Sequence, residues 1–193
     1  MIETTKIMNE TIKIIMERRS VRSYTQDQIK DTELKSILDA GMYAPSAMNQ
    51  QSWHFTAIQS KDIIHRINEE CKNIFLKSGN KQLEERAKSP KFDLFYNAPT
   101  LIIVSGKKDN IAPEIDCATA LQNMFLAAES INIGSCWIHG VTTLENSESG
   151  KNLIKELGIP EDYKIVGSGI FGYKAAVAPE PAPRKEHTVN IIK

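Results

Sequence analysis

Three arginines stand close together near the beginning of the chain, in the stretch ERRSVRSY from Glu17 to Tyr24. Arg18, Arg19 and Arg22 lie within five positions of one another, although the whole chain has 24 basic and 24 acidic residues. A guanidinium group presents paired N–H donors that match two oxygens of a phosphate, so the cluster suggests anion recognition. Taken alone, however, arginines at the end of a helix are better explained as solvated groups that the helix dipole favours.

A second polar cluster, APSAMNQQSW from Ala44 to Trp53, lies where a helical pattern breaks at Pro45. Its side chains supply hydrogen-bond donors and acceptors that can pair with a planar heterocycle. The residues that supply them are Ser46, Asn49, Gln50 and Gln51. The same composition fits a loop of turn-forming residues equally well.

A third cluster, PEPAPRK from Pro179 to Lys185, is a stiff, extended segment with two cations at its end. Basic residues in such a tail are usually solvated. Beside the first cluster, however, Arg184 and Lys185 would give a second set of cations for one phosphate.

Other motifs are missing or weak. There is no Walker phosphate loop and no zinc-ligand spacing. GSGIFG, Gly167 to Gly172, has the letters of a dinucleotide-binding motif, but it lies within a predicted strand and no clear helix follows it. Its glycines are better explained as positions where something approaches a strand closely. The four histidines and three cysteines are scattered, so neither set predicts a metal site or a catalytic triad.

The composition bounds the class of protein. A chain of 193 residues with 41% hydrophobic and 25% charged residues is typical of one globular domain, residues 1–193. A net charge of zero argues against a general nucleic-acid or membrane binder. The polar N-terminal stretch does not resemble a signal peptide, and no apolar run approaches transmembrane length. We therefore expect a cytoplasmic protein, with its thiols in a reducing environment.

Hydrophobic periodicity predicts helices that alternate irregularly with strands. A first helix should end near Arg19 or Ser20, and a second should be capped by Asp31 or Thr32 and stopped by Pro45. A third helix buries a stripe from Ile63 to Phe75, and residues 78–96 fit either a helix or a mobile lid. The most apolar helix runs from Glu114 to Asn132 and should be buried nearly all round. A further helix is predicted over Asn146 to Leu157.

Four segments have the composition of strands: Trp53 to Gln59, Thr100 to Gly106, GSCWIHGV (134–141) and KIVGSGIFGY (164–173). The continuous apolar run of Thr100 to Gly106 suits a central strand. The tail ends in TVNII, which also has strand composition. Because the elements do not alternate strictly, we predict an α+β fold, with a sheet packed among helices.

Four motifs, in this order, resemble the nitroreductase family of FMN-dependent oxidoreductases. They are RRSVR before a helix, APSAMNQQSW before a strand, GSCWIHG, and FGY followed by a Pro-rich segment ending in PRK. The resemblance covers about Ile12 to Lys185. It implies an α+β fold around a mainly antiparallel sheet, and a homodimer with FMN at the subunit interface and a C-terminal tail exchanged between subunits. It also implies NADH or NADPH as electron donor and nitroaromatics, quinones or similar small molecules as acceptors.

The resemblance also implies roles for individual residues. Arg18, Ser20 and Arg22 would contact the FMN phosphate, ribityl chain and ring edge, and Arg19 belongs to the same motif. A loop reaching over from the other subunit would contribute Pro45, Ser46, Ala47 and Asn49. The strand facing the reactive side of the flavin ring would contribute Ile138, His139 and Gly140, and Arg184 would reach the phosphate.

Three positions depart from the family's pattern. Ser52 and Lys174 stand where the family often has proline, and His139 stands near a position that is often acidic. These departures bear on the acceptor and the nicotinamide donor more than on FMN binding.

The resemblance implies that no side chain is a catalytic nucleophile, acid or base, because the flavin carries the chemistry. Arg22 is the best candidate for a cation that stabilises the reduced flavin. The alternatives are other flavin chemistry on the same scaffold, such as reductive dehalogenation or flavin fragmentation, and a flavin-binding module without enzymatic activity.

Overall fold

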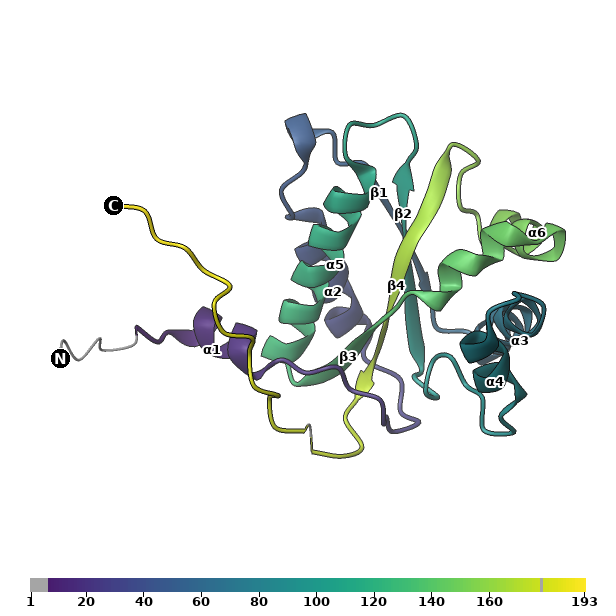
Figure 1. The fold of residues 1–193 in the computed structure, drawn as a ribbon, viewed down its shortest axis with the longest axis horizontal. Coiled ribbons are helices and arrows are strands. Elements are labelled where there is room, and N and C mark those ends of the chain that lie inside the picture. Colours follow the sequence, from purple (N-terminus) through teal and green to yellow (C-terminus); the bar gives the residue numbers. More distant parts are fainter. Residues whose placement is uncertain (1–6, 178) are drawn as a thin grey trace.

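A four-stranded antiparallel sheet forms the centre of the fold, with the strand order β1-β2-β4-β3 (Figure 1). The computed structural model describes residues 7–177 and 179–193. The strands are β1 (Trp53–Ile58), β2 (Thr100–Lys107), β3 (Ile133–Ile138) and β4 (Tyr163–Tyr173). This arrangement confirms the predicted α+β fold with an antiparallel sheet.

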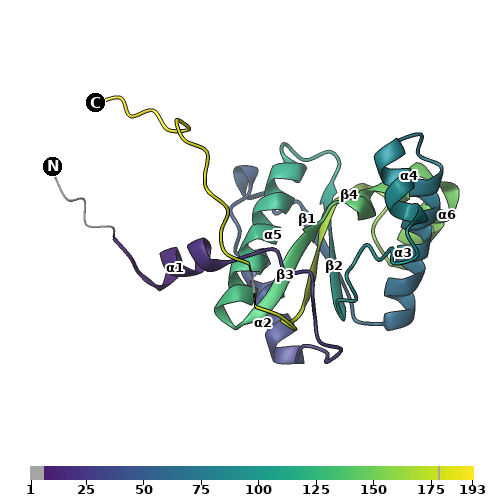
Figure 2. The same ribbon diagram turned by 60° about the horizontal axis from the view of Figure 1, so that its bottom comes forward.

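Helices cover both faces of the sheet (Figures 1 and 2). On one face lie α2 (Asp31–Met42) and α5 (Pro113–Ser130). On the other lie α3 (Lys61–Leu76), α4 (Lys81–Lys88) and α6 (Glu148–Glu156). Two short 3₁₀ helices, η1 (Ala47–Asn49) and η2 (Gly140–Asn146), lie in the connections, and α1 (Glu10–Glu17) projects from the body.

Strand β2 explains why the core has two halves. Leu101 and Ile103 pack into the cluster beneath α3, whereas Ile102 and Val104 pack into the cluster beneath α5. Successive side chains of a strand point to opposite faces, so a strand covered on both faces needs an unbroken apolar run. The prediction that Thr100 to Gly106 forms a central strand is confirmed.

Glycines in β4 permit close packing against β3 and α5. A Cβ atom on Gly167 would lie 2.6 Å from the ring of Trp137, and one on Gly169 would lie 2.9 Å from the ring of Phe125. The interpretation of GSGIFG as a strand that something approaches closely is therefore confirmed.

Helix α1 ends at Glu17, two to three residues before the predicted end at Arg19 or Ser20. The arginine motif that follows is extended, and Ser20 pairs with Ser135 of β3 in an isolated bridge. The N–H of Val21 donates to the carbonyl of Ser135 at 2.9 Å. Pairing with the sheet thus supplies the hydrogen bonds that one more helical turn would have made.

The start of α2 was predicted at the right residue but with the wrong cap. Asp31 is the first helical residue, and neither Asp31 nor Thr32 caps the helix. Instead, the carboxylate of Glu33 accepts a hydrogen bond of 2.7 Å from the N–H of Lys30. The helix ends at Met42, before Pro45, as expected from the missing N–H of proline.

Other helix and strand boundaries also differ from those predicted. The segment 78–96 contains α4, so the helix alternative is correct for its first half. Strand β3 ends at Ile138, and the prediction that it continues through Val141 is wrong. There the hydroxyl of Thr143 donates to the carbonyl of Gly140 at 2.7 Å, and the N–H of Thr142 donates to that of His139 at 3.0 Å. These local bonds turn the chain away from the sheet.

The C-terminal tail runs away from the body after passing the end of α1 (Figures 1 and 2). Residues 179–193 are exposed throughout, and none of them belongs to a strand. The predicted strand at TVNII is therefore not formed within a single chain.

Candidate active site

The three arginines of the first cluster have different surroundings. The guanidinium of Arg19 donates to the carbonyls of Met16 and Arg18, both at 2.6 Å, so it closes the end of α1. This is the structural role that the helix-end interpretation assigns to such an arginine. The guanidinium carbon of Arg18 instead lies 6.0 Å from the centre of the Phe125 ring on α5.

Arg22 lies on the other side of the extended segment. Its guanidinium carbon is 5.9 Å from the centre of the Tyr96 ring, and one N–H is 3.4 Å from the carbonyl of Ser20. Within the described part of the chain, neither Arg18 nor Arg22 makes an ion pair with a carboxylate. Their charges are therefore available to an anion.

A pocket of about 380 Å³ joins Arg22 to the end of β3. Ile138, His139 and Gly140 line it, so Arg22 of the first cluster meets the segment that the resemblance assigns to the flavin ring. The remaining lining comes from apolar, aromatic and hydroxyl side chains, together with one further cation: Phe75, Leu83, Arg86, Leu94, Tyr96, Cys136, Trp137, Thr142 and Thr143. No carboxylate lines the pocket, which makes it positively charged in a chain whose net charge is zero.

Neighbouring side chains leave no room for a Cβ atom at Gly140. A Cβ atom at this position would lie 2.9 Å from the ring of Phe75 and 3.0 Å from a methyl group of Leu94. The thiol of Cys71 lies 3.9 Å from the Gly140 carbonyl, and burial raises the pKa of this thiol to about 12. The thiol is therefore protonated at neutral pH, which suits a donor to that carbonyl.

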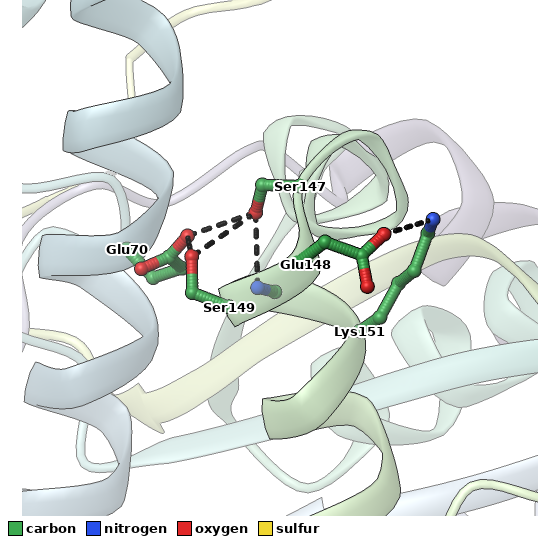
Figure 3. Close-up of polar contacts among 6 residues, drawn as sticks. Glu70, Ser147, Glu148, Ser149 and Lys151 are labelled. Atoms are coloured by element: carbon green, nitrogen blue, oxygen red, sulfur yellow. Dashed lines mark hydrogen bonds and ion pairs between the residues drawn. The ribbon is translucent and has the colours of Figure 1, made fainter.

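A polar cluster behind the pocket holds η2 and α6 against α3 (Figure 3). Glu70 on α3 accepts hydrogen bonds from the hydroxyls of Ser147, at 2.9 Å, and Ser149, at 2.6 Å. The Ser147 oxygen also accepts from the N–H of Gly150 at 2.9 Å, which caps α6. Because η2 runs from Gly140 directly into this cap, the cluster positions the turn that lines the pocket.

The loop around Pro45 is not part of this pocket. The carboxylate of Asp116, on the first turn of α5, accepts from the N–H of Ala47 at 3.0 Å and from the Ser52 hydroxyl at 2.6 Å. Asp116 and Phe125 are nine residues apart, which is about 13 Å along a helix axis. Pro45, Ser46, Ala47 and Asn49 therefore lie toward the opposite end of α5 from Arg18.

This loop contains three residues other than glycine in the left-handed region: Met48 (φ 51°), Asn49 (φ 55°) and Gln51 (φ 45°). Asparagine tolerates this conformation, but Met48 and Gln51 adopt it at a cost of order 1 kcal/mol each. The hydrogen bonds to the buried Asp116 hold the loop in this shape, with the Met48 side chain 84% exposed.

Arg184 is exposed in the tail, and no hydrogen bond or ion pair joins it to another described residue. The tail passes the end of α1, where the arginine motif begins (Figures 1 and 2). The ribbon of the tail therefore lies near the start of the arginine motif, although no hydrogen bond or ion pair joins these two segments among the described residues.

The sequence of this chain matches the profile of the nitroreductase family over residues 15–173. The chain belongs to the nitroreductase family. A nitroreductase from Bacteroides fragilis, whose crystal structure contains bound FMN, is 40% identical to it. The TM-score is 0.92, and the match covers 96% of this chain and 100% of that one.

Two further nitroreductase relatives have informative names. An Archaeoglobus fulgidus protein, provisionally named NADH dehydrogenase/NAD(P)H nitroreductase, is 33% identical over 86% of each chain. A Bacillus subtilis protein named FMN reductase [NAD(P)H] is 26% identical over 95% of this chain and 73% of its own length. The family predicted from the four sequence motifs is therefore confirmed.

The structure explains two departures from the family's sequence pattern. Ser52, where proline is often found, is buried and bonded to Asp116. Lys174, where proline is also often found, makes an ion pair of 2.8 Å with Glu129, and both side chains are less than one-fifth exposed. Both residues stabilise this chain's own packing.

Sequence reasoning missed Tyr96 and Arg86, which line the pocket from the segment left open between helix and lid. For Arg86 a signal existed, because the helical spacing of Leu83, Arg86 and Ala87 places these three residues on one face of a helix. Among the described residues, no group of three or more metal-ligating side chains occurs. Likewise, no helix of the described chain is long and apolar enough to cross a membrane.

Proposed function

We propose that this protein is an FMN-dependent oxidoreductase that accepts electrons from NADH or NADPH and passes them to nitroaromatics, quinones or similar small acceptors. The observation that carries the proposal is the pocket in which Arg22 meets the Ile138–Gly140 segment. It occurs in a chain that is 40% identical, over nearly its whole length, to a nitroreductase with bound FMN.

The residues present fit FMN chemically. Arg18, Arg22 and Arg184 offer guanidinium donors for a terminal phosphate and for the ring edge, and Ser20 adds a hydroxyl. The pocket supplies aromatic and aliphatic walls for a planar ring. Bound flavin would supply hydride transfer, which no side chain of the pocket can supply.

The chain's own residues bind and orient. The cation of Arg22, stacked on Tyr96, would stabilise negative charge on a bound ring. The turn at His139 and Gly140 would present backbone to the ring. Cys71 and Thr143 both donate to the Gly140 carbonyl and so fix the conformation of this turn. The pocket would admit the electron donor and the acceptor in succession.

The proposal includes a homodimer with FMN at the subunit interface. Helix α1 buries none of its residues, and Ile15 and Met16 are 51% and 41% exposed. The outer face of α5 leaves Ile115 exposed, so the prediction that this helix is buried nearly all round does not hold within one chain. A second copy would cover these surfaces and could bring its own Pro45–Asn49 loop to the pocket.

The purified protein should be yellow and should release FMN, rather than FAD, on heating. Under anaerobic conditions, NADH or NADPH should bleach the flavin, and a nitroaromatic or a quinone should restore its colour. Colourless protein that takes up no added FMN would contradict the proposal that FMN is the cofactor. Flavin that is reduced but passes electrons to no acceptor would instead indicate a non-enzymatic flavin-binding module.

A further inference from the structure

Arg86 is the cation of the pocket that the proposed function leaves unused. It lies on α4, whereas Arg22 comes from the arginine motif that follows α1. Leu83 and Arg86 are three residues apart and so share one face of the helix, which lines the pocket. Ala87, next to Arg86, is fully buried and anchors α4 against the core.

The guanidinium of Arg86 has no described partner. No ion pair and no side-chain hydrogen bond joins it to any residue in 7–177 or 179–193, although Glu84 and Glu85 precede it in the same helix. The residue is exposed, and it lines a pocket that has no carboxylate in its lining. Arg22, by contrast, is already stacked on Tyr96.

We propose that Arg86 makes this pocket select substrates that carry an oxyanion on, or attached to, a planar ring. The inference rests on the proposed function, since it concerns the substrate that meets the flavin. Phe75, Leu83 and Leu94 give the pocket apolar walls for a ring. The guanidinium fork then offers two parallel N–H donors to a carboxylate or a phosphate at the edge of that ring.

Two substrates could supply this oxyanion. One is an acceptor with a carboxylate, such as 4-nitrobenzoate. The other is the nicotinamide donor, whose phosphate groups also present pairs of anionic oxygens to a guanidinium. In the acceptor reaction, NADH and one proton convert the nitro group to a nitroso group, so that NAD⁺ and water are formed. Arg86 takes no part in this transfer and acts as a specificity-determining residue.

The test compares 4-nitrobenzoate with 4-nitrobenzamide, which has nearly the same shape but no charge. The ratio of their kcat/KM values in the Arg86→Ala holoenzyme should fall about tenfold or more from that of the wild type, because a charge-assisted pair is lost. Arg86→Lys should keep part of the preference. Using the ratio within each variant cancels the different reactivities of the two nitro groups.

The matched control is Lys88→Ala, which removes the same charge from the same helix. Lys88 is exposed and does not line the pocket, so its ratio should stay at the wild-type value. A stopped-flow measurement of flavin reduction by NADH and NADPH tests the electron donor separately. If Arg86→Ala slows only this reduction, the oxyanion belongs to the nicotinamide substrate. If Arg86→Ala lowers only the ratio for the two nitro compounds, the oxyanion belongs to the acceptor.

Binding supplies a readout apart from activity. Trp137 lines the pocket, so in a Trp53→Phe background its fluorescence should report benzoate binding more strongly than benzamide binding, and Arg86→Ala should abolish the difference. This measurement decides the role of Arg86 even if the protein takes up no FMN. Unchanged ratios and unchanged benzoate binding in Arg86→Ala would overturn the inference. So would a weakened FMN affinity, which would place the guanidinium on the cofactor.

Discussion

At the scale of single residues, Arg18 and Arg19 are neighbours with opposite roles. Arg19 donates its N–H groups to two carbonyls at the end of α1. Arg18 instead lies over the Phe125 ring, and its donors remain available. Identical side chains therefore differ in what they can offer to a ligand. Arg184, which is exposed in the tail, likewise keeps its N–H donors available to a ligand.

Arg18→Ala and Arg184→Ala should each weaken FMN affinity by roughly tenfold or more, since each removes a charge-assisted hydrogen bond to phosphate worth about 1.5–3 kcal/mol. Arg19→Ala is the contrasting variant. It should lower FMN affinity less, because its guanidinium is already bonded to the backbone. Titration of the apo-variants with FMN measures all three. Wild-type affinity in Arg18→Ala and Arg184→Ala would mean that both are solvated surface residues.

Residue types and the family resemblance named the residues of the candidate site, but they did not predict its geometry. The arginine motif and the Ile138–Gly140 segment were identified from sequence, and the structure brings Arg22 and that segment into one pocket. The distinct role of Arg19 could not be predicted, because it depends on where α1 ends. Tyr96 escaped notice for a similar reason: it adopts a φ of 53°, which propensities do not anticipate for an aromatic residue.

At the scale of elements, the polar cluster of Glu70, Ser147 and Ser149 joins three segments. It caps α6, ties that helix to α3 and fixes the end of η2, whose first residue lines the pocket (Figure 3). Capping hydroxyls of this kind contribute about 1 kcal/mol each to stability.

Ser147→Ala should therefore lower the free energy of unfolding by about 1 kcal/mol or somewhat more, because it removes the cap and one bond to Glu70. Urea denaturation followed by circular dichroism provides the measurement. Ser36→Ala is the control: its hydroxyl bonds only to the Thr32 carbonyl within α2, so its loss should be nearly neutral. Equal stabilities of the two variants would show that the cluster contributes nothing to the fold.

The elements themselves were largely predictable, since the apolar runs of β2 and β4 and the stripes of α2 and α3 follow the spacing that burial requires. Their ends were less so. Strand β3 stops at Ile138 because the Thr143 hydroxyl and the Thr142 N–H offer the carbonyls alternative partners, and such competition between nearby bonds leaves no periodic signal.

At the scale of the whole molecule, one pocket has to serve two substrates. The pocket of about 380 Å³ would hold either a nicotinamide or an acceptor against a bound ring, but not both. Turnover should therefore be ping-pong, with parallel double-reciprocal plots at several acceptor concentrations. Intersecting lines would mean that donor and acceptor bind together, and the single-pocket description would be wrong.

The uncovered apolar surfaces of the chain lead to the last prediction. The tail ends with Val189, Ile191 and Ile192, which are 76%, 77% and 96% exposed, and α1 buries nothing. Such residues are expected to be covered in an assembly. If the tail embraces a second subunit, deleting the residues after Lys185 should weaken the dimer and lower FMN occupancy together.

Light scattering gives the mass, and the ratio of flavin to protein absorbance gives the occupancy. A full-length variant with serine at positions 189, 191 and 192 is the matched control for chain length. It should behave like the truncated protein if the apolar contacts, rather than the backbone of the tail, hold the subunits together. A frayed tail without a partner would leave mass and occupancy unchanged in both variants. A monomeric mass for the wild type with FMN fully bound would exclude the shared site altogether, because a single chain keeps the Pro45–Asn49 loop toward the far end of α5 from Arg18.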